Sequence, residues 1–238
     1  MFFSVLSLWI ARPGRSQEDC RLMPTDHRMP FRDRTDAGRR LGQALSAYAG
    51  RDDLLVLGLP RGGVPVAAEI ARLLGAPLDV LLVRKLGVPG HEELAMGAIA
   101  EGGATVVNKS VVDMLAVSDD VFRDVVDRET RELVRRQHLY RGSRTPPVVA
   151  NRTVIVVDDG LATGATMEAA VAALRHLGPA AIVVAAPVGA RETCARLRAV
   201  ADEVVCVETP PDFGAVGAWY RDFTQTTDAE VRRLIAGT

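Results

Sequence analysis

The sequence has few of the residues that mark secreted or metal-binding proteins. Its 238 residues include three cysteines and four histidines. The cysteines, Cys20, Cys194 and Cys206, form no CxxC pair, and the histidines show no metal-ligand spacing. These absences argue against a disulfide framework and a zinc site, and they favour the reducing cytoplasm.

Charge of one sign is not in excess either. The formal net charge is −1, from 29 basic and 30 acidic residues. No long basic run occurs, so we expect neither a nucleic acid nor a membrane as a partner. No Gly-x-Gly-x-x-Gly sequence follows a strand-like run, which excludes the usual dinucleotide-binding fingerprint.

Long hydrophobic runs are also missing. Residues 2–11 are apolar but too few to span a bilayer, and they lack the features of a signal peptide. Residues 12–28 are polar and irregular. We expect residues 1–28 to be an N-terminal extension that is disordered or wrongly assigned to the protein, with an interfacial anchor as the alternative. Residues 29–238 are expected to form one domain.

Apolar residues alternate between strand and helix patterns through this domain. Strands are expected at residues 54–59, 78–83, 104–108, 154–157, 181–186 and 203–207. Helices are expected at residues 37–48, 66–74, 119–139, 167–177, 191–198 and 228–235. This order predicts an α/β fold with a mostly parallel central sheet flanked by helices. Residues 84–103 are rich in glycine and charge, and we expect a mobile loop there.

Residues 154–166 read Val-Ile-Val-Val-Asp-Asp-Gly-Leu-Ala-Thr-Gly-Ala-Thr. The four β-branched residues indicate a buried strand, so Asp158 and Asp159 lie at its carboxyl end, where ligands bind in open α/β sheets. The small and hydroxylated residues that follow open a helix, whose free N–H groups suit a phosphate. Two carboxylates beside a phosphate site suit sugar hydroxyls or Mg²⁺. The segment therefore predicts a site for a phosphorylated sugar.

These thirteen residues resemble the phosphoribosyl pyrophosphate (PRPP) signature of the type I phosphoribosyltransferases. The resemblance implies that Asp158 and Asp159 hold the ribose hydroxyls during catalysis and are the candidate ligands of Mg²⁺, directly or indirectly. It also implies that the 5′-phosphate is bound by a loop of four residues. That loop consists of Thr163, Gly164, Ala165 and Thr166.

A second loop combines glycines with a cation at the end of the first core strand. Arg61 offers a fork of donors that matches phosphate oxygens, and Gly62 and Gly63 expose backbone N–H groups. By itself such a loop is equally consistent with a tight structural turn. The resemblance places it where the family binds pyrophosphate, with Arg84 and Lys85 as further candidates.

The resemblance also assigns two mobile parts. Residues 86–102 match the family's flexible loop, which would close over the site and limit hydrolysis. The titratable residues that this loop could bring to the site are His91, Glu92 and Glu93. For the two glutamates, ordinary solvated carboxylates are the simpler interpretation. A variable C-terminal hood would bind the base, with Trp219 and Tyr220 as candidates. Alternatively, these aromatic residues only attach the C-terminal segment to the core.

The expected reaction is transfer of 5-phosphoribosyl from PRPP, with Mg²⁺, to a nucleobase or related nitrogen acceptor, with release of pyrophosphate. Ala162 stands where oxopurine enzymes carry an acid, so an oxopurine acceptor is disfavoured. The alternative is a regulatory protein that senses PRPP or nucleotides with little catalysis, although the chain has no clear basic face for nucleic acid. Many members of the family form homodimers, and we expect one here.

Overall fold

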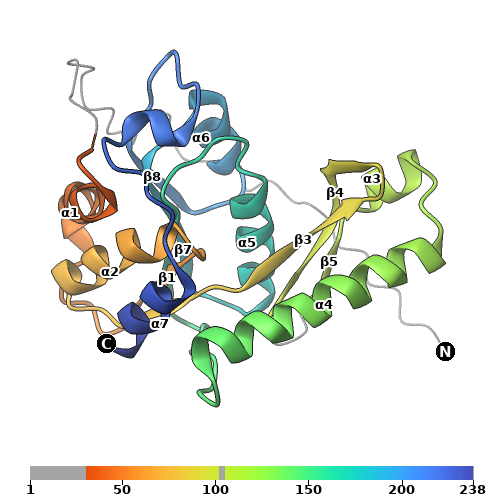
Figure 1. The fold of residues 1–238 in the computed structure, drawn as a ribbon, viewed down its shortest axis with the longest axis horizontal. Coiled ribbons are helices and arrows are strands. Elements are labelled where there is room, and N and C mark those ends of the chain that lie inside the picture. Colours follow the sequence, from red (N-terminus) through yellow and green to blue (C-terminus); the bar gives the residue numbers. More distant parts are fainter. Residues whose placement is uncertain (1–30, 102–104, 238) are drawn as a thin grey trace.

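The computed structural model describes residues 31–101 and 105–237. The proposed N-terminal extension thus lies outside the described residues. Five parallel strands form the central sheet in the order β2-β1-β6-β7-β8 (Figure 1). They are β1 (Leu54–Gly58), β2 (Leu78–Val80), β6 (Thr153–Val157), β7 (Ala181–Val188) and β8 (Glu203–Glu208). The predicted parallel α/β fold is confirmed.

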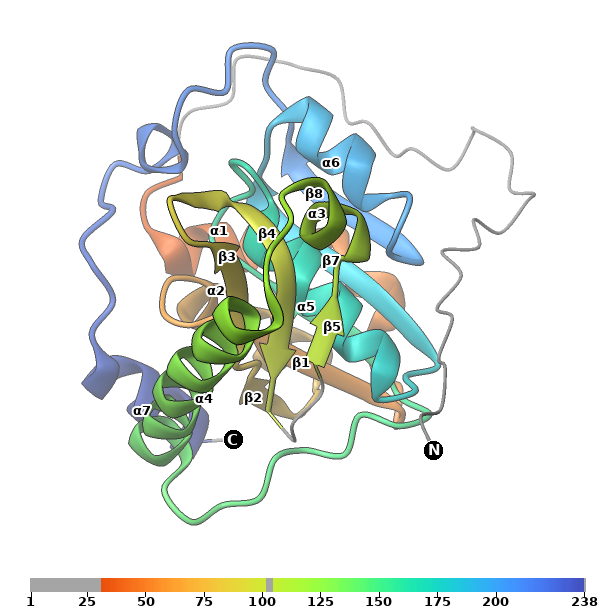
Figure 2. The same ribbon diagram turned by 90° about the vertical axis from the view of Figure 1, so that its right-hand side faces the viewer.

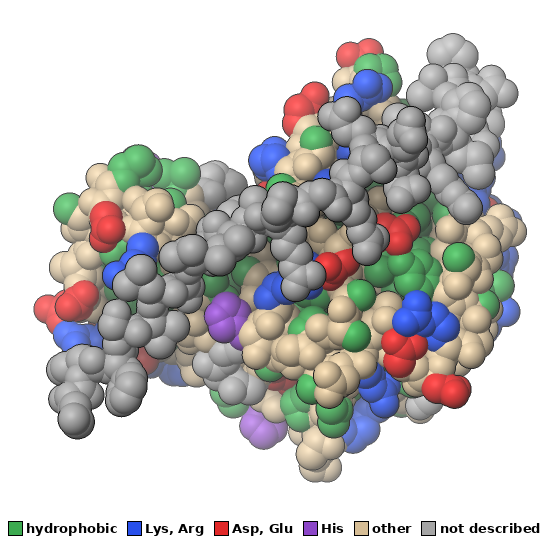
Figure 3. All heavy atoms as spheres, turned by 180° about the vertical axis from the view of Figure 1, so that it is seen from behind, with side chains coloured by type: hydrophobic (Ala, Val, Ile, Leu, Met, Phe, Trp, Pro, Cys, Tyr) green, Lys and Arg blue, Asp and Glu red, His purple; other side chains and the backbone are tan. Residues whose placement is uncertain are grey.

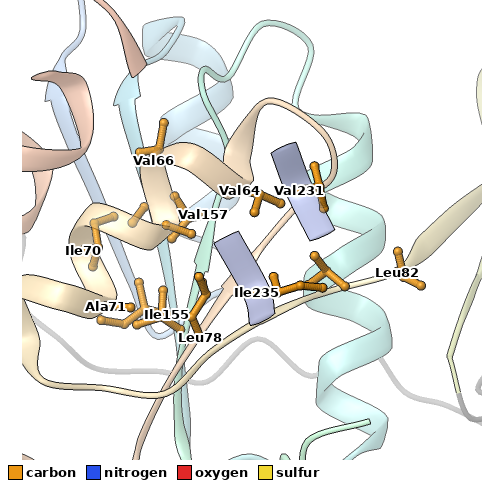
Figure 4. Close-up of a cluster of buried hydrophobic side chains, with 14 of the residues drawn as sticks. Val64, Val66, Ile70, Ala71, Leu78, Leu82, Ile155, Val157, Val231 and Ile235 are labelled. Atoms are coloured by element: carbon orange, nitrogen blue, oxygen red, sulfur yellow. The ribbon is translucent and has the colours of Figure 1, made fainter. Parts of the chain in front are cut away.

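Helices cover both faces of this sheet because its central strands are apolar on both faces. Every residue of β1 and β6 is buried. Alternate residues, such as Val56 and Ile155, pack with α1 (Arg34–Ala44), α2 (Gly63–Leu74) and α7 (Asp228–Ala236). Their neighbours pack on the other face, with α5 (Ala165–His176) and α6 (Arg191–Leu197). Figure 4 shows Val231 and Ile235 of α7 beside Val64 of α2.

Of the region predicted as a mobile loop, residues 84–103, the described residues 84–101 form mainly regular strands. β3 (Val83–Val88) and β4 (His91–Ala100) pair as an antiparallel hairpin, and β5 (Thr105–Val107) adds a third strand. The glycines that suggested a loop serve this sheet. Gly90 takes a positive φ of 79° at the turn, and a Cβ on Gly97 would collide with the carbonyl of Val106. The expectation of a segment without regular structure was wrong, because glycine also permits close strand packing. The mobility of this segment stays a prediction.

The hairpin continues into α3 (Lys109–Met114) and the long helix α4 (Asp119–Arg141). We call the described residues 83–101 and 105–141 the arm, since Figure 1 shows them projecting from the parallel sheet. Several exposed apolar side chains lie on it, and Figure 3 shows hydrophobic side chains gathered toward its end. The exposed large apolar side chains of the arm are Leu94, Val107, Met114, Val121 and Val134.

A buried arginine attaches the arm to the sheet. Arg141, at the end of α4, donates from Nε to Asp79 at 2.9 Å and also contacts the carbonyl of Val80 and the carboxylate of Glu101. Burial raises the pKa of Glu101 above its usual value. The structure buries Arg141 at the base of the arm.

Two short 3₁₀ helices, Ser46–Tyr48 and Val216–Trp219 (η2), complete the secondary structure of the described residues. In that part of the chain, no helix is both long enough and apolar enough to cross a bilayer. On the face drawn in Figure 3, basic and acidic side chains are interspersed among the described residues.

Candidate functional site

The two loops singled out in the sequence meet at one edge of the sheet. β1 and β6 are parallel neighbours, with Gly58 paired to Val157, so both loops leave the sheet at its carboxyl edge. A Cβ on Gly63 would lie 2.9 Å from the Cα of Asp158, and one on Gly62 would overlap Oδ2 of Asp159. Glycine at these positions therefore lets the two loops pack directly on each other.

The two acids have different surroundings. The carboxylate of Asp158 accepts a hydrogen bond from the backbone N–H of Asp159 at 2.9 Å. Burial, and then the neighbouring Asp159 carboxylate, raise the pKa of Asp158 well above its usual value. Nε of Arg34 donates to Oδ2 of Asp159 at 2.8 Å, and Nη2 of the same guanidinium forms an ion pair with this oxygen at 2.7 Å. Among the described residues, a cation thus pairs directly with Asp159 and not with Asp158.

Sequence analysis missed Arg34, which lies 125 positions before its partner Asp159. Its guanidinium also donates to the carbonyl of Thr224 at 2.8 Å and lies 4.0 Å from the ring centroid of Phe223. Arg34 opens α1 as one of several arginines there, and no local pattern distinguishes it from Arg32 or Arg39. Only the tertiary fold places it in the site.

Aromatic residues from both ends of the described chain cover this acid loop. Phe31 pairs with Tyr220 in a β-bridge, and their ring centroids lie 5.5 Å apart. The hydroxyl of Tyr220 donates to the backbone carbonyl of Asp159 at 2.6 Å, and its side chain is buried. Trp219 donates from its indole to the carbonyl of Phe213 at 2.9 Å. Tyr220 thus fits the interpretation in which the aromatic residues attach the C-terminal segment to the core.

The segment after the acids begins a helix, as the sequence pattern indicates. Gly164 is the N-terminal cap residue of α5 and takes a φ of 73°, a left-handed conformation that glycine adopts without strain. Two side chains of α6 bind the loop that precedes α5. Thr193 donates to the carbonyl of Ala162 at 2.6 Å, and Arg196 donates to the carbonyl of Thr163 at 2.7 Å. The exposed Thr163 and the first N–H groups of α5 are thereby fixed at the open edge.

A family model of the phosphoribosyl transferase domain matches residues 32–223, which include both loops. The chain belongs to the phosphoribosyl transferase family. It is 50% identical over 202 residues to the "Putative phosphoribosyl transferase Rv0571c" of Mycobacterium tuberculosis, a match that covers 84% of this chain and 45% of that protein. The chain therefore spans less than half the length of this relative.

Two further comparisons support this family membership. The chain is 36% identical over 129 residues to the "Bifunctional protein PyrR" of Chloroflexus aurantiacus, covering 52% of this chain and 64% of that protein. The crystal structure of TT1426 from Thermus thermophilus aligns with a TM-score of 0.80 and 45% identity, covering 88% of this chain and 99% of that one. The phosphoribosyl transferase fold predicted from the sequence is thus confirmed.

The three cations predicted to bind pyrophosphate in this phosphoribosyl transferase chain have different environments. Arg61 Nη1 lies 4.0 Å from Oδ1 of Asp228. Arg84 donates to the mostly buried Glu129 at 2.8 Å and lines a small cavity that also involves Pro60 and Thr166. Lys85 is the next residue of β3, so its side chain points to the opposite face of the hairpin. Arg84, but not Lys85, therefore lies beside the predicted phosphate loop.

The three candidates from the predicted flexible loop lie at the start of β4. His91 and Glu92 are exposed, and the side chain of Glu93 lies outside the described part of the chain. Oε1 of Glu92 accepts from the backbone N–H of Gly90 at 3.2 Å, and backbone hydrogen bonds lower the pKa of Glu92. Within the described residues, no hydrogen bond or ion pair joins His91 or Glu92 to the two loops.

Proposed function

We propose that the protein transfers 5-phosphoribosyl from PRPP to a nitrogen acceptor and releases pyrophosphate. The observation that carries this proposal is the direct packing of the Arg61 loop against the two acids, with Gly62 against Asp159. A helix N-terminus on one side and a cation loop on the other suit the two phosphate-bearing ends of one sugar. The acids lie between them, where the ribose would sit.

Each group would have a separate role in this reaction. The N–H groups at Thr163 and Gly164 would bind the 5′-phosphate, and Asp158 with Asp159 would orient the ribose and balance positive charge that develops on it. Arg61 and the amides of the glycine pair would stabilise the departing pyrophosphate. Arg34 and Tyr220 touch Asp159 from outside, so they would act as positioning residues.

The site also suits Mg²⁺ that arrives with the substrate. Mg²⁺ typically binds one or two carboxylates together with substrate phosphates and water. Asp158 and Asp159 would supply the carboxylates, and the described residues contain no larger cluster of ligating side chains. When bound, the ion would neutralise charge on the pyrophosphate.

Ala162 bears on the acceptor. Its side chain offers no carboxylate to an oxopurine, so we propose another nucleobase or a related nitrogen compound. Trp219 remains a candidate for the wall beside this acceptor, whereas the buried ring of Tyr220 is already covered by neighbours. Because the chain spans 45% of the length of its Mycobacterium relative, the activity of a longer protein would include parts outside this sequence.

The decisive test measures pyrophosphate release from PRPP and Mg²⁺ across a panel of bases and amines. The variant Asp158→Asn should lose about 10²- to 10³-fold in rate, the usual cost of removing one charge stabiliser. Asp52→Asn is the matched control. Asp52 is exposed and lies just before the first residue of β1, at the sheet edge opposite the site, so this variant should keep full activity. Near-full activity in Asp158→Asn would refute the assignment of the site.

A regulatory protein that senses PRPP or nucleotides is the second candidate, because the chain resembles "Bifunctional protein PyrR" over 52% of its length. This candidate predicts that PRPP binds but that no acceptor in the panel causes it to release pyrophosphate. PRPP binding measured by calorimetry, together with silence across the panel, would favour that candidate.

A further inference from the structure

A cavity of about 400 Å³ lies on the outer side of the Arg61 loop. Its volume lies within the range of small-molecule sites, roughly 300–1,000 Å³. The lining comes from the Arg61 loop, the C-terminal part of α4 and the start of α7, and Figures 1 and 2 both show α7 beside that end of α4. The lining residues are Pro60, Arg61, Arg135, Arg136, Tyr140 and Asp228.

Two of the three arginines are held in place by one acid. Glu132, one turn earlier on α4, accepts from Arg135 at 2.7 Å and 3.0 Å and from Arg136 at 2.8 Å. These hydrogen bonds lower the pKa of Glu132 to about 2, so it stays ionised and fixes both side chains. They use Nε and Nη2 of Arg135 but only Nε of Arg136. Within the described residues, no other hydrogen bond uses Nη1 of Arg135 or either Nη group of Arg136, so these groups remain as donors.

The opposite wall contains the third arginine and the single acid of the lining. Asp228 accepts from the hydroxyl of Tyr140 at 2.6 Å. Arg61 lies 4.0 Å from the same carboxylate oxygen, and no hydrogen bond among the described residues uses its guanidinium. The lining thus contains three cations and one carboxylate, and that carboxylate already has a hydroxyl donor. With Glu132 behind two of the cations, three positive charges stand against two negative ones. An anion with several oxygens could engage donors on both walls.

We propose that this cavity binds a polyphosphate chain, as in a di- or triphosphate, at a site distinct from that of PRPP. Guanidinium groups bind phosphate oxygens in pairs of hydrogen bonds, and three of them on two facing walls favour a ligand with more than one phosphate. Arg61 belongs both to this cavity and to the proposed pyrophosphate loop. If the proposed function holds, occupancy of the cavity changes the affinity for PRPP, and PRPP changes the affinity of the cavity by the same factor.

The test is calorimetric titration of the full chain with sodium tripolyphosphate, without Mg²⁺ or PRPP. Arg135→Gln should weaken binding up to about fivefold, because an exposed charged contact contributes at most about 1 kcal/mol. Arg123→Gln is the matched control, since Arg123 also lies on α4 and pairs with an acid three residues earlier, Asp120. It should leave the affinity unchanged.

A second variant predicts a change of opposite sign. Asp228→Asn removes the only negative charge of the lining, so tripolyphosphate should bind several-fold more tightly. Equal weakening by Arg135→Gln and Arg123→Gln would indicate general attraction to α4 and overturn the proposal. Unchanged binding in both Arg135→Gln and Asp228→Asn would place the anion in the PRPP site and also overturn it. The titration measures binding without turnover. Failure of the proposed reaction would be seen only in the assay of pyrophosphate release, so the two failures can be distinguished.

Discussion

Replacement of Arg34 by methionine should destabilise the fold much more than replacement of a surface arginine. The guanidinium of Arg34 donates from Nε to Oδ2 of Asp159 and forms an ion pair with it through Nη2, and the two side chains are only 11% and 15% exposed. Methionine retains much of the aliphatic volume but leaves the carboxylate of Asp159 without its cation. It also removes the hydrogen bond to Thr224 and the contact with the ring of Phe223.

The magnitude follows from the burial of the pair. Removing one partner of a fully buried ion pair costs about 3–5 kcal/mol. The remaining exposure of Arg34 and Asp159 reduces this, and we expect a loss of roughly 2–4 kcal/mol in the free energy of unfolding. Arg39 provides the matched control on the same helix. It is 50% exposed and pairs with Glu69 at 3.3 Å, so Arg39→Met should cost no more than about 1 kcal/mol.

Urea denaturation of wild type, Arg34→Met, Arg39→Met and Asp159→Asn would measure these losses. The double variant Arg34→Met/Asp159→Asn completes a double-mutant cycle. The sum of the stability losses in the two single variants should exceed the loss in the double variant by at least about 1 kcal/mol. Similar losses in Arg34→Met and Arg39→Met would refute the argument, because the Arg34 pair would then contribute no more than a surface ion pair. Additive losses in the cycle would contradict direct coupling of Arg34 to Asp159.

Two further predictions concern the glycine contact and the tyrosine in the outer cavity. Gly62→Ala places a Cβ against Oδ2 of Asp159 and should cost about 1–3 kcal/mol in urea denaturation; Gly237→Ala meets no atom closer than 3.7 Å and should be nearly neutral. Burial and the hydrogen bond to Asp228 raise the pKa of Tyr140 from 10.0 to about 12. Folding therefore favours the protonated phenol, and this stabilisation is complete below about pH 10 and is lost as the pH rises toward about 12. The stability advantage of wild type over Tyr140→Phe should shrink by on the order of 1–2 kcal/mol between about pH 9 and pH 12, and a constant difference would contradict this.

Local patterns were sufficient where backbone chemistry decides the structure. A run of β-branched residues followed by acids and a glycine-rich turn dictates a buried strand, a polar edge and a helix start within about a dozen residues. For this reason residues 154–166 indicated the phosphoribosyl transferase family before any contact was known. The alternation of strands and helices predicted the parallel sheet for the same reason, since each element needs an apolar face to bury.

Local patterns failed where one residue type serves two structures. Glycine and charge in residues 84–103 indicated a loop, but Gly97 allows close approach of β5, and Arg84 is paired with Glu129 of α4. Arg84 and Glu129 lie 45 positions apart in the sequence, and only the folded structure brings them together. Tyr220 similarly suggested a base-binding surface until its contacts with Phe31 and Asp159 were known.

The sequence by itself determined the fold class, the family and the two loops, because each depends on neighbouring residues. Only the tertiary structure brought Arg34 to Asp159 and distinguished the two acids that the motif presents as equivalent. Only it placed Arg135 and Arg136 beside Arg61, across a cavity built from three separate segments. Charge pairing acts over a few ångströms of space and is independent of distance along the chain, so no local pattern could have revealed these contacts.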